Sequence, residues 1–377
     1  MATIRVYLAL AQPRRVHQAP PSKRRVAFGE MSLAKPPRNP ATFALCGATV
    51  CSTVLICAVF FGSGGLRRFD SPLAAYTAAT IFASFAFAYR YLMWIQRPAT
   101  WRYFWASWKL FLRPKKLLRN GLKLAMLLWN NIIVQKFIGR RSPTRWIAHM
   151  GMAWGCLLAF AITFPLSWGW VQFGVAADGK NYQVEFMGMR QFAFDPNSIV
   201  GFFLFNGLNF SAAFVLIGIA FAMHRRVFQH GAHAVQSIEN DLIPLVLLFA
   251  VSITGLMITA SERLMQGAHF GFISLLHAFM VILLLLWMPF GKLFHVFQRP
   301  AQLGVAYYKE EGANGPQAVC IRSGTEYQSA VHHDDLVAVM KEVGVDFGDH
   351  QNLSPQEKRR LIAINQLDAL QDRSFVG

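Results

Sequence analysis

The chain has 377 residues, of which 54% are hydrophobic and 15% are charged, and its formal net charge is +18. Its apolar residues lie in long uncharged runs, which is typical of an integral membrane protein and argues against an ordinary soluble domain. The residues before Arg299 hold 29 Lys and Arg against 8 Asp and Glu, whereas the rest of the chain holds 8 against 11. Basic clusters beside membrane helices set topology and bind anionic lipid, so we expect membrane lipid, and no nucleic acid, as a partner.

The cysteines do not form a metal-binding pattern. They are Cys46, Cys51, Cys57, Cys156 and Cys320. No two of them have the CxxC spacing, which argues against a zinc ribbon, a cysteine-ligated iron–sulfur cluster or a covalently attached c-type haem. We therefore expect no iron–sulfur cluster in this chain. We also expect no cleavable signal peptide, because the first 40 residues are polar and basic.

Six apolar runs are long enough to span a membrane, and they predict an all-α, six-helix transmembrane bundle. The runs are 42–62, 73–95, 146–173, 199–223, 242–261 and 270–295. The expected domains are a basic cytoplasmic N-terminal arm (1–40), an extra transmembrane helix (41–72), a five-helix membrane domain (73–300) with an inner-surface loop (96–145), and a cytoplasmic tail with short helices (301–377).

Charge alternates between the loops of this bundle. Residues 1–40 hold eight basic residues and one acid, and residues 97–145 hold twelve basic residues and no acid. The loop 174–198 holds three acids and two bases. The positive-inside rule then predicts that both termini are cytoplasmic. Within the basic loop, the aromatic and basic run 101–113 predicts an interfacial amphipathic helix, and Leu122–Phe137 predicts either a second one or a buried re-entrant helix.

The tail contains two patterns of interest. Ser354-Pro355-Gln356-Glu357 is a helix-start signature and predicts a helix to about Leu370. His332-His333-Asp334-Asp335 has the residue types of a metal site, but the start of a short helix that ends near Glu342 is the favoured interpretation.

Two histidines mark the ends of the last apolar run. His277 and His295 are 18 residues apart, which is five turns of one helix, so both imidazoles are expected on one face. The rise between them is roughly 27 Å, close to the thickness of the hydrocarbon core. Pro289, between them, is expected to kink the helix and to free a carbonyl. Ionisable residues inside a membrane helix indicate function.

The predicted topology gives His295 a partner. His149 begins the third run from the inner side, so it shares a depth with His295, and two imidazoles from different helices are the ligands of a b-type haem. Gly151 and Gly155 either let a porphyrin lie flat against this helix, which is the favoured interpretation, or pack two helices together. Lys292 is placed either for a haem propionate or as an interfacial anchor.

His277 has no histidine partner at its own depth, because the third run has Ala159 there. Three interpretations stay open. His277 lines a quinone pocket near the outer surface together with His269, it ligates a second haem with an unusual partner, or it is a buried histidine satisfied by a hydrogen bond.

These residues resemble a known family. The segment from His277 to Met288-Pro289-Phe290-Gly291-Lys292-Leu293-Phe294-His295 looks like the last helix of the gamma subunit of respiratory nitrate reductase. In that family two haem-ligating histidines have this spacing. Trp146–Met152 is similar to its first histidine helix, and His224–Phe228 resembles the Lys-Arg-Arg-Leu-Phe end of the next. The resemblance covers about residues 73–310 and extends to membrane subunits of heterodisulfide-reductase-like complexes.

The resemblance implies a cytochrome b in which His149 and His295 hold the inner haem and His277 is one ligand of an outer haem, whose second ligand would fall on Ala159. It implies a membrane-anchoring electron-transfer subunit of an oxidoreductase complex in the bacterial inner membrane. Such a subunit exchanges electrons between quinone or quinol and a cytoplasmic iron–sulfur subunit or flavoprotein. A secondary transporter without haem and a cofactor-free anchor for a soluble redox enzyme are the alternatives.

Overall fold

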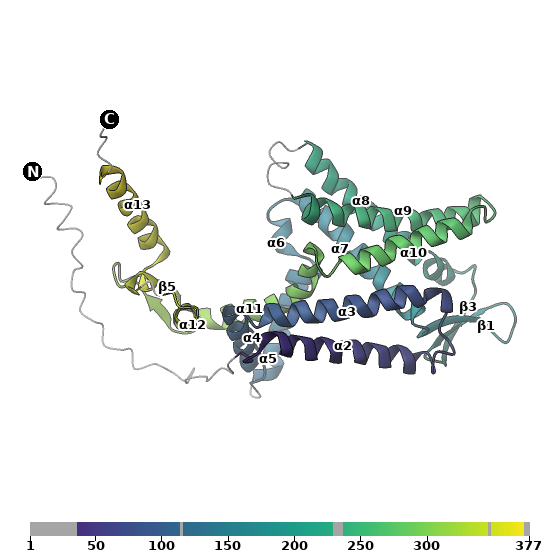
Figure 1. The fold of residues 1–377 in the computed structure, drawn as a ribbon, viewed down its shortest axis with the longest axis horizontal. Coiled ribbons are helices and arrows are strands. Elements are labelled where there is room, and N and C mark those ends of the chain that lie inside the picture. Colours follow the sequence, from purple (N-terminus) through teal and green to yellow (C-terminus); the bar gives the residue numbers. More distant parts are fainter. Residues whose placement is uncertain (1–35, 114–115, 229–236, 346–347, 373–377) are drawn as a thin grey trace, which may run out of the picture. The chain divides into compact units, whose positions relative to one another are not determined.

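The computed structural model describes residues 36–113, 116–228, 237–345 and 348–372 (Figure 1). The expected arm over residues 1–40 therefore lies almost wholly outside the described residues. Contacts divide the chain into two units. The span unit comprises Arg38–Trp94 and Leu128–Pro300, and the tail unit comprises Ile95–Leu127 and the residues from Ala301 onwards. The first part of the basic loop thus belongs with the tail.

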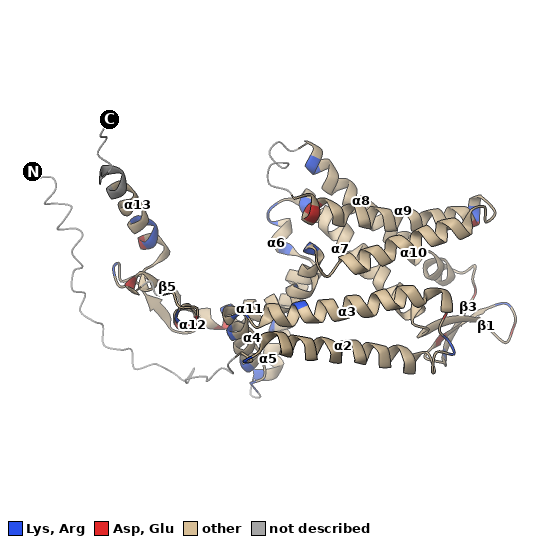
Figure 2. Cartoon of the chain, in the orientation of Figure 1, with Lys and Arg blue, Asp and Glu red and all other residues tan. Residues whose placement is uncertain are grey.

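Six helices of the described chain are long and apolar enough to cross a membrane, so the predicted all-α bundle is confirmed and the chain is a multi-pass membrane protein. They are α2 (Pro40–Gly62), α3 (Ala74–Ile95, preceded by the short turn η1, Ser71–Leu73), α7 (Pro143–Ser167), α8 (Ile199–Phe228), α9 (Ile243–Leu264, preceded by η5, Ile238–Leu242) and α10 (Phe270–Trp287). Figure 2 shows that Lys and Arg lie mainly toward the ends of these helices, which stay uncharged along their middles. Short helical segments η3 (Trp129–Ile133) and α6 (Lys136–Gly139) precede α7.

Helix α7 begins where the sequence supplies both a cap and a proline. The Ser142 side chain accepts a hydrogen bond from the Arg145 backbone N–H at 3.4 Å, and Pro143 occupies the first turn. This start is favourable because the first turn of a helix has unpaired N–H groups and proline has none to leave unpaired. Because the cap fixes the residue at which α7 begins, it also fixes the position of every later residue along the helix axis.

The closest helix pair in the span unit is α7 with α8, and small residues make it close. A Cβ atom at Gly218 would lie 2.7 Å from the carbonyl oxygen of Ala148 and 2.7 Å from the backbone nitrogen of Met152. The Ser211 hydroxyl donates to the Gly155 carbonyl at 2.7 Å. Such close backbone approach is the usual way that helices associate where lipid removes the hydrophobic driving force.

In the sequence, a three-stranded antiparallel sheet connects the end of α7 to the start of α8. Its strands β1 (Val171–Val175), β2 (Tyr182–Phe186) and β3 (Met189–Phe194) pair in the order β1-β2-β3. Helix α7 therefore ends at Ser167, earlier than the predicted span to residue 173. Gln172 of β1 donates to the Arg68 carbonyl in the turn between α2 and α3 at 2.9 Å, and Trp170, just before β1, donates to the Ala58 carbonyl of α2 at 3.0 Å.

The predicted single helix over residues 270–295 is wrong at its end. Helix α10 stops at Trp287, a 3-10 turn follows (η6, Lys292–Phe294), and His295 begins a separate helix, α11 (His295–Ala313). Pro289 has no N–H to continue the helix, as expected. Gly291 allows the chain to turn beneath Trp287, since a Cβ at residue 291 would lie 2.0 Å from that indole. His277 and His295 are therefore not on one helix face.

The tail unit contains α4 (Pro98–Phe111), α5 (Leu117–Leu128), α12 (Ala330–Glu342) and α13 (Pro355–Asp372), with the strand pair β4 (Gln317–Val319) and β5 (Glu326–Ser329) and a 3-10 turn, η7 (Gly348–Asn352). The predicted helices from Ser354 and around His332 are confirmed as α13 and α12. The Ser354 hydroxyl accepts from the Glu357 N–H at 3.3 Å, as the signature predicts.

A buried polar network joins α4 to the tail. Arg102 Nε contacts Asp335 Oδ1 at 2.6 Å, and the Tyr308 hydroxyl donates to the other oxygen of the same carboxylate. Burial and the neighbouring Asp335 raise the pKa of the Tyr308 phenol, so it stays protonated and keeps donating. Trp101 and Leu110 are also buried on α4. Helix α4 therefore packs as a core element of the tail unit, with fewer side chains available for a membrane surface than the sequence indicates.

The α7–α8 contact predicts that a Gly→Ala substitution lowers the thermal stability at residue 218 but not at residue 271. We expect Gly218→Ala to lower the thermal unfolding midpoint of the detergent-solubilised protein by several degrees, because the new methyl overlaps backbone atoms. Gly271→Ala, near the start of α10, has nothing within 4 Å of the added methyl and is the matched control. Its midpoint should stay equal or rise, since alanine favours helix. Equal losses in the two variants would contradict the close packing at residue 218.

The Asp335 network predicts how stably the tail is docked on α4. We expect Asp335→Ala to weaken the docking of the tail on α4 by about 2 kcal/mol, which corresponds to roughly 30-fold faster proteolysis of the tail in the full-length protein. The measurement is the rate of tail cleavage by a dilute protease, followed by intact mass spectrometry. Asp334→Ala is the control, because the Asp334 side chain is 80% exposed. Equal cleavage rates in the two variants would rule out the network as the clamp.

Candidate functional site

The structure brings His149 and His295 together. Their ring centroids are 6.2 Å apart and their planes are inclined by 66°. His149 lies in the second turn of α7, and His295 is the first residue of α11, so 146 positions of sequence separate them. Both belong to the span unit, and His149 lies near the start of α7, whereas the sheet follows the end of that helix.

The imidazole of His295 is oriented by the backbone. Its Nδ1 lies 2.6 Å from the Lys292 carbonyl oxygen, which can only accept, so Nδ1 carries the proton. In the neutral ring, Nε2 is then the unprotonated nitrogen. A histidine held in this way by a backbone carbonyl is the usual arrangement of a metal ligand, because the bond fixes both tautomer and ring direction.

His149 has an atom that lacks a partner. Its Nδ1 is buried, and it has no hydrogen-bond partner within the described part of the chain. A buried polar atom left unpaired costs about 1–3 kcal/mol, so such atoms call for an explanation. If the imidazole of His149 held a metal or a metal-containing group, its unpaired buried nitrogen would be accounted for.

The two rings lie within the range of an ordinary edge-to-face contact. Their centroid separation of 6.2 Å and their inclination of 66° are typical of such a pair. Among the described residues, no group of three or more His, Cys, Asp or Glu side chains could hold a metal ion.

Arg90 donates hydrogen bonds to the turn that follows the end of α10. Its guanidinium donates to the carbonyl of Pro289 and to that of Gly291, at 3.4 Å for the latter, and it lies 4.3 Å from the ring centroid of Phe294. Because α10 ends at Trp287, these carbonyls have no N–H partner from a following helical turn. An arginine has several N–H donors and can bond to more than one of them. Arg90 therefore fixes the path of the chain into His295. From the sequence alone, Arg90 is expected near the inner end of the second apolar run, where its long side chain could reach the membrane surface.

Lys292 bonds to a side chain on another element. Its Nζ lies 2.5 Å from Asp241 Oδ1, and this ion pair joins η6 to η5. Arg226 donates to the carbonyl of the same Asp241 at 2.7 Å. Lys292 is three residues from His295, as the propionate interpretation requires, but in the structure it ties two turns of the span unit together.

Gly151 and Gly155 lie in the α7–α8 contact. A Cβ at Gly151 would be 2.8 Å from the Phe214 carbonyl oxygen, and one at Gly155 would be 2.8 Å from that of Ser211. The structure thus uses both glycines for helix packing, which is the second of the two interpretations that the sequence allows.

His277 is hydrogen-bonded within the bundle. Its Nδ1 lies 2.9 Å from the Thr254 hydroxyl of α9, and that hydroxyl donates to the Ala250 carbonyl at 2.7 Å. Because the Thr254 hydroxyl donates its proton to the Ala250 carbonyl, Nδ1 of His277 must be the donor to that hydroxyl. The Nε2 atom of the neutral ring is then unprotonated and can accept a hydrogen bond. His269 is exposed at the start of α10, two turns before His277. The partner of His277 in the described structure is therefore a threonine, which the sequence analysis did not name.

Comparison of the chain with models of protein families, with curated proteins and with solved structures finds no match.

The role of Arg90 predicts a local change in dynamics. We expect Arg90→Met to leave the carbonyls of Pro289 and Gly291 unpaired and to speed amide hydrogen exchange in peptides spanning 288–298 at least tenfold, since that loop would lose its bonds to α3. Arg67→Met, in the exposed turn after α2, is the control and should leave these peptides unchanged. Unchanged exchange in Arg90→Met would show that the turn is held by other contacts.

Proposed function

We propose that the chain is the membrane-anchoring b-type cytochrome subunit of an oxidoreductase complex, with a haem held between His149 and His295. The observation that carries the proposal is the approach of these two imidazoles to a centroid separation of 6.2 Å from helices far apart in sequence. When bound, a haem would supply one-electron transfer.

The chain's own residues would set the conditions at this site. The Lys292 carbonyl fixes His295 as a ligand through Nε2, and the capped start of α7 sets the level of His149. Apolar side chains surround the entry to α11, since Phe294 is buried in a cluster with Phe87 and Met288. A low-dielectric, water-poor surrounding of this kind tunes the redox potential of a bound iron.

His277 is the candidate for quinone contact, with His269 nearer the end of the bundle. With its Nδ1 proton given to Thr254, His277 presents Nε2 as an acceptor, which suits a quinol hydroxyl. A second haem at His277 would require another ligand, whereas the side chain that bonds to His277 in the described structure is Thr254. We therefore propose one haem, between His149 and His295.

The distribution of basic residues supports a proposed location and topology for the chain. We expect the bacterial inner membrane, with both termini in the cytoplasm, because the basic clusters lie in the N-terminal arm and in the loop after α3. The electron partner would be a cytoplasmic iron–sulfur subunit or flavoprotein in a hetero-oligomeric complex. The absence of CxxC spacing from the sequence is compatible with clusters that are held by another subunit.

Three histidine variants test the pairing. We expect His149→Ala and His295→Ala each to abolish the same b-type haem, because each removes one of the two imidazoles that would hold it, while His277→Ala keeps it. The measurement is a dithionite-reduced minus oxidised spectrum and a pyridine haemochrome assay on membranes that contain the assembled complex. Immunoblotting and size exclusion must show that each variant is inserted and monodisperse.

Two results would count against the proposal. A wild-type complex without any b-type band would favour a transporter or a cofactor-free anchor. Loss of all haem in His277→Ala would contradict the pairing of His149 with His295. The ratio of haem to polypeptide, near one or near two, decides whether His277 ligates a second haem.

A further inference from the structure

Helix α5 of the tail unit leaves one apolar side exposed. Leu118, Leu122 and Met126 recur at intervals of four residues, so they lie on one side of the helix. These residues are 81%, 61% and 60% exposed. Gly121 lies on the same side, and a Cβ atom there would meet nothing within 4 Å. This set of residues, the α5 face, is therefore not covered by any described part of the chain.

The opposite side of α5 is packed within the tail unit. Asn120 is buried, and its side-chain amide donates to the carbonyls of Leu110 at 3.1 Å and Phe111 at 3.0 Å, at the end of α4. Leu127, seven residues later and on the same side, is also buried. These contacts fix the rotation of α5 about its axis, so the α5 face cannot turn inward without breaking them.

Basic residues border the α5 face. Arg119 and Lys123 are four positions apart and form a row about 100° around the helix from that face. Both contact the carboxylate of Glu311, at 3.4 Å and 2.5 Å respectively. Lys116, directly before α5, is exposed as well. Helix α5 itself contains no acidic residue, so this edge keeps an excess of positive charge.

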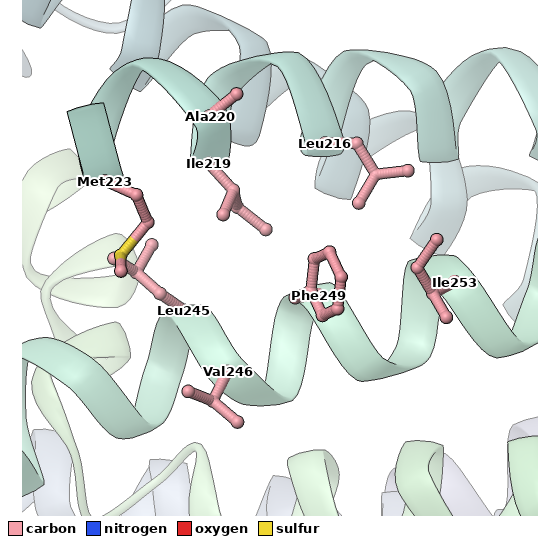
Figure 3. A pocket seen from close by; sticks show the side chains of 8 residues that line it. All are labelled: Leu216, Ile219, Ala220, Met223, Leu245, Val246, Phe249 and Ile253. Carbon is pink, nitrogen blue, oxygen red and sulfur yellow. The ribbon is translucent and has the colours of Figure 1, made fainter.

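Apolar exposure by itself does not identify a ligand, as a second surface illustrates. In the span unit, an apolar groove of about 530 Å³ runs between α8 and α9 (Figure 3). None of the eight side chains that line it is polar, so the groove does not select one hydrocarbon chain over another. The α5 face is more informative, because its basic border requires a ligand that is both apolar and negatively charged.

We propose that α5 lies in the surface of a bilayer, with the α5 face among the acyl chains and Lys116 and Arg119 at the level of the phosphates of anionic phospholipids. Helices with leucine on one face and Lys or Arg beside it bind membranes in this way. The interfacial role that the sequence predicts for residues 101–113 thus passes to the next helix. Two spans, α3 and α7, flank α4 and α5 in the sequence, which keeps α5 within reach of the membrane.

Two other occupants of the α5 face match it less well. The arm over residues 1–40 would bring eight bases and one acid against an edge that is already basic. A partner protein would need an apolar centre with an acidic rim, whereas a membrane with anionic lipid presents both features to a protein that spans it. No histidine takes part, so the proposal stands or fails separately from the proposed haem.

The test places the photocrosslinking residue p-benzoylphenylalanine at position 118 of the full-length protein, in vesicles of phosphatidylcholine and phosphatidylglycerol. Irradiation should attach phospholipid to the peptide that contains residue 118, detected by mass spectrometry. The same substitution at Val343, which is 56% exposed at the end of α12, is the control in the same unit. Its lipid yield should be roughly tenfold lower, because this residue lies outside the α5 face. Both positions are exposed, so the fold should tolerate the larger side chain.

A second measurement tests the charges. In vesicles with equal amounts of the two lipids, phosphatidylglycerol should exceed phosphatidylcholine roughly threefold or more among the adducts at residue 118. Lys116→Gln combined with Arg119→Gln should bring the two lipids to equal yield. Lys358→Gln combined with Arg359→Gln, on α13, removes the same charge outside the α5 face and should keep the preference. Elution profiles of all variants must match that of the parent protein.

Three results would overturn the proposal. The first is an equal lipid yield at residues 118 and 343. The second is an adduct of residue 118 to a polypeptide in place of lipid, in membranes that contain the assembled complex, which would assign the α5 face to a partner subunit or to the N-terminal arm. The third is an equal yield of the two lipids before the bases are replaced, which would show that the charged border selects no headgroup.

Discussion

The end of α10 at Trp287 is the constraint on which the candidate site depends. A continuous helix would have carried His295 along the axis of α10 and kept it on the face of His277. Pro289 cannot continue the hydrogen-bond ladder, and Gly291 lets the chain pass under the Trp287 ring. The carbonyls freed by this break would be costly in an apolar bundle, and Arg90 satisfies them. One partly buried guanidinium thus stabilises the turn that brings His295 to α7.

The other half of the site is set by helix packing. His149 takes its level from the Ser142 cap and its lateral position from the contact of α7 with α8, where glycines bring the two backbones together. The Asp241–Lys292 pair adds a third restraint, since it joins the turn before α9 to the turn before His295. Three elements that are distant in sequence therefore converge near the two imidazoles, and each ring is held by restraints from its own side.

Much of this fold could be predicted from sequence, because long uncharged runs and helix-start signatures are local signals. The six spans and the helix after Ser354 belong to this class. Pro289 was expected only to kink a continuous helix, whereas α10 ends at Trp287 and a new helix begins at His295. The depth argument brought His149 and His295 together through topology alone. What could not be predicted depends on partners far along the chain: Thr254 for His277, the Gly218 backbone for Gly151 and Gly155, and Asp335 for Arg102. The sheet after α7 had only the Asp178-Gly179 turn as a local signal, within a segment read as a loop.

The Arg102–Asp335 contact has a consequence for how the protein is made. The two residues are 233 positions apart, and Asp335 follows every span in the chain. A ribosome therefore finishes the entire bundle before it delivers the partner of α4. Until then, Arg102 lacks its carboxylate partner, and the apolar side chains of α4 lack the tail residues that pack on them in the folded protein. The docking of the tail on α4 is therefore a late step of folding, which follows the synthesis of all six described spans.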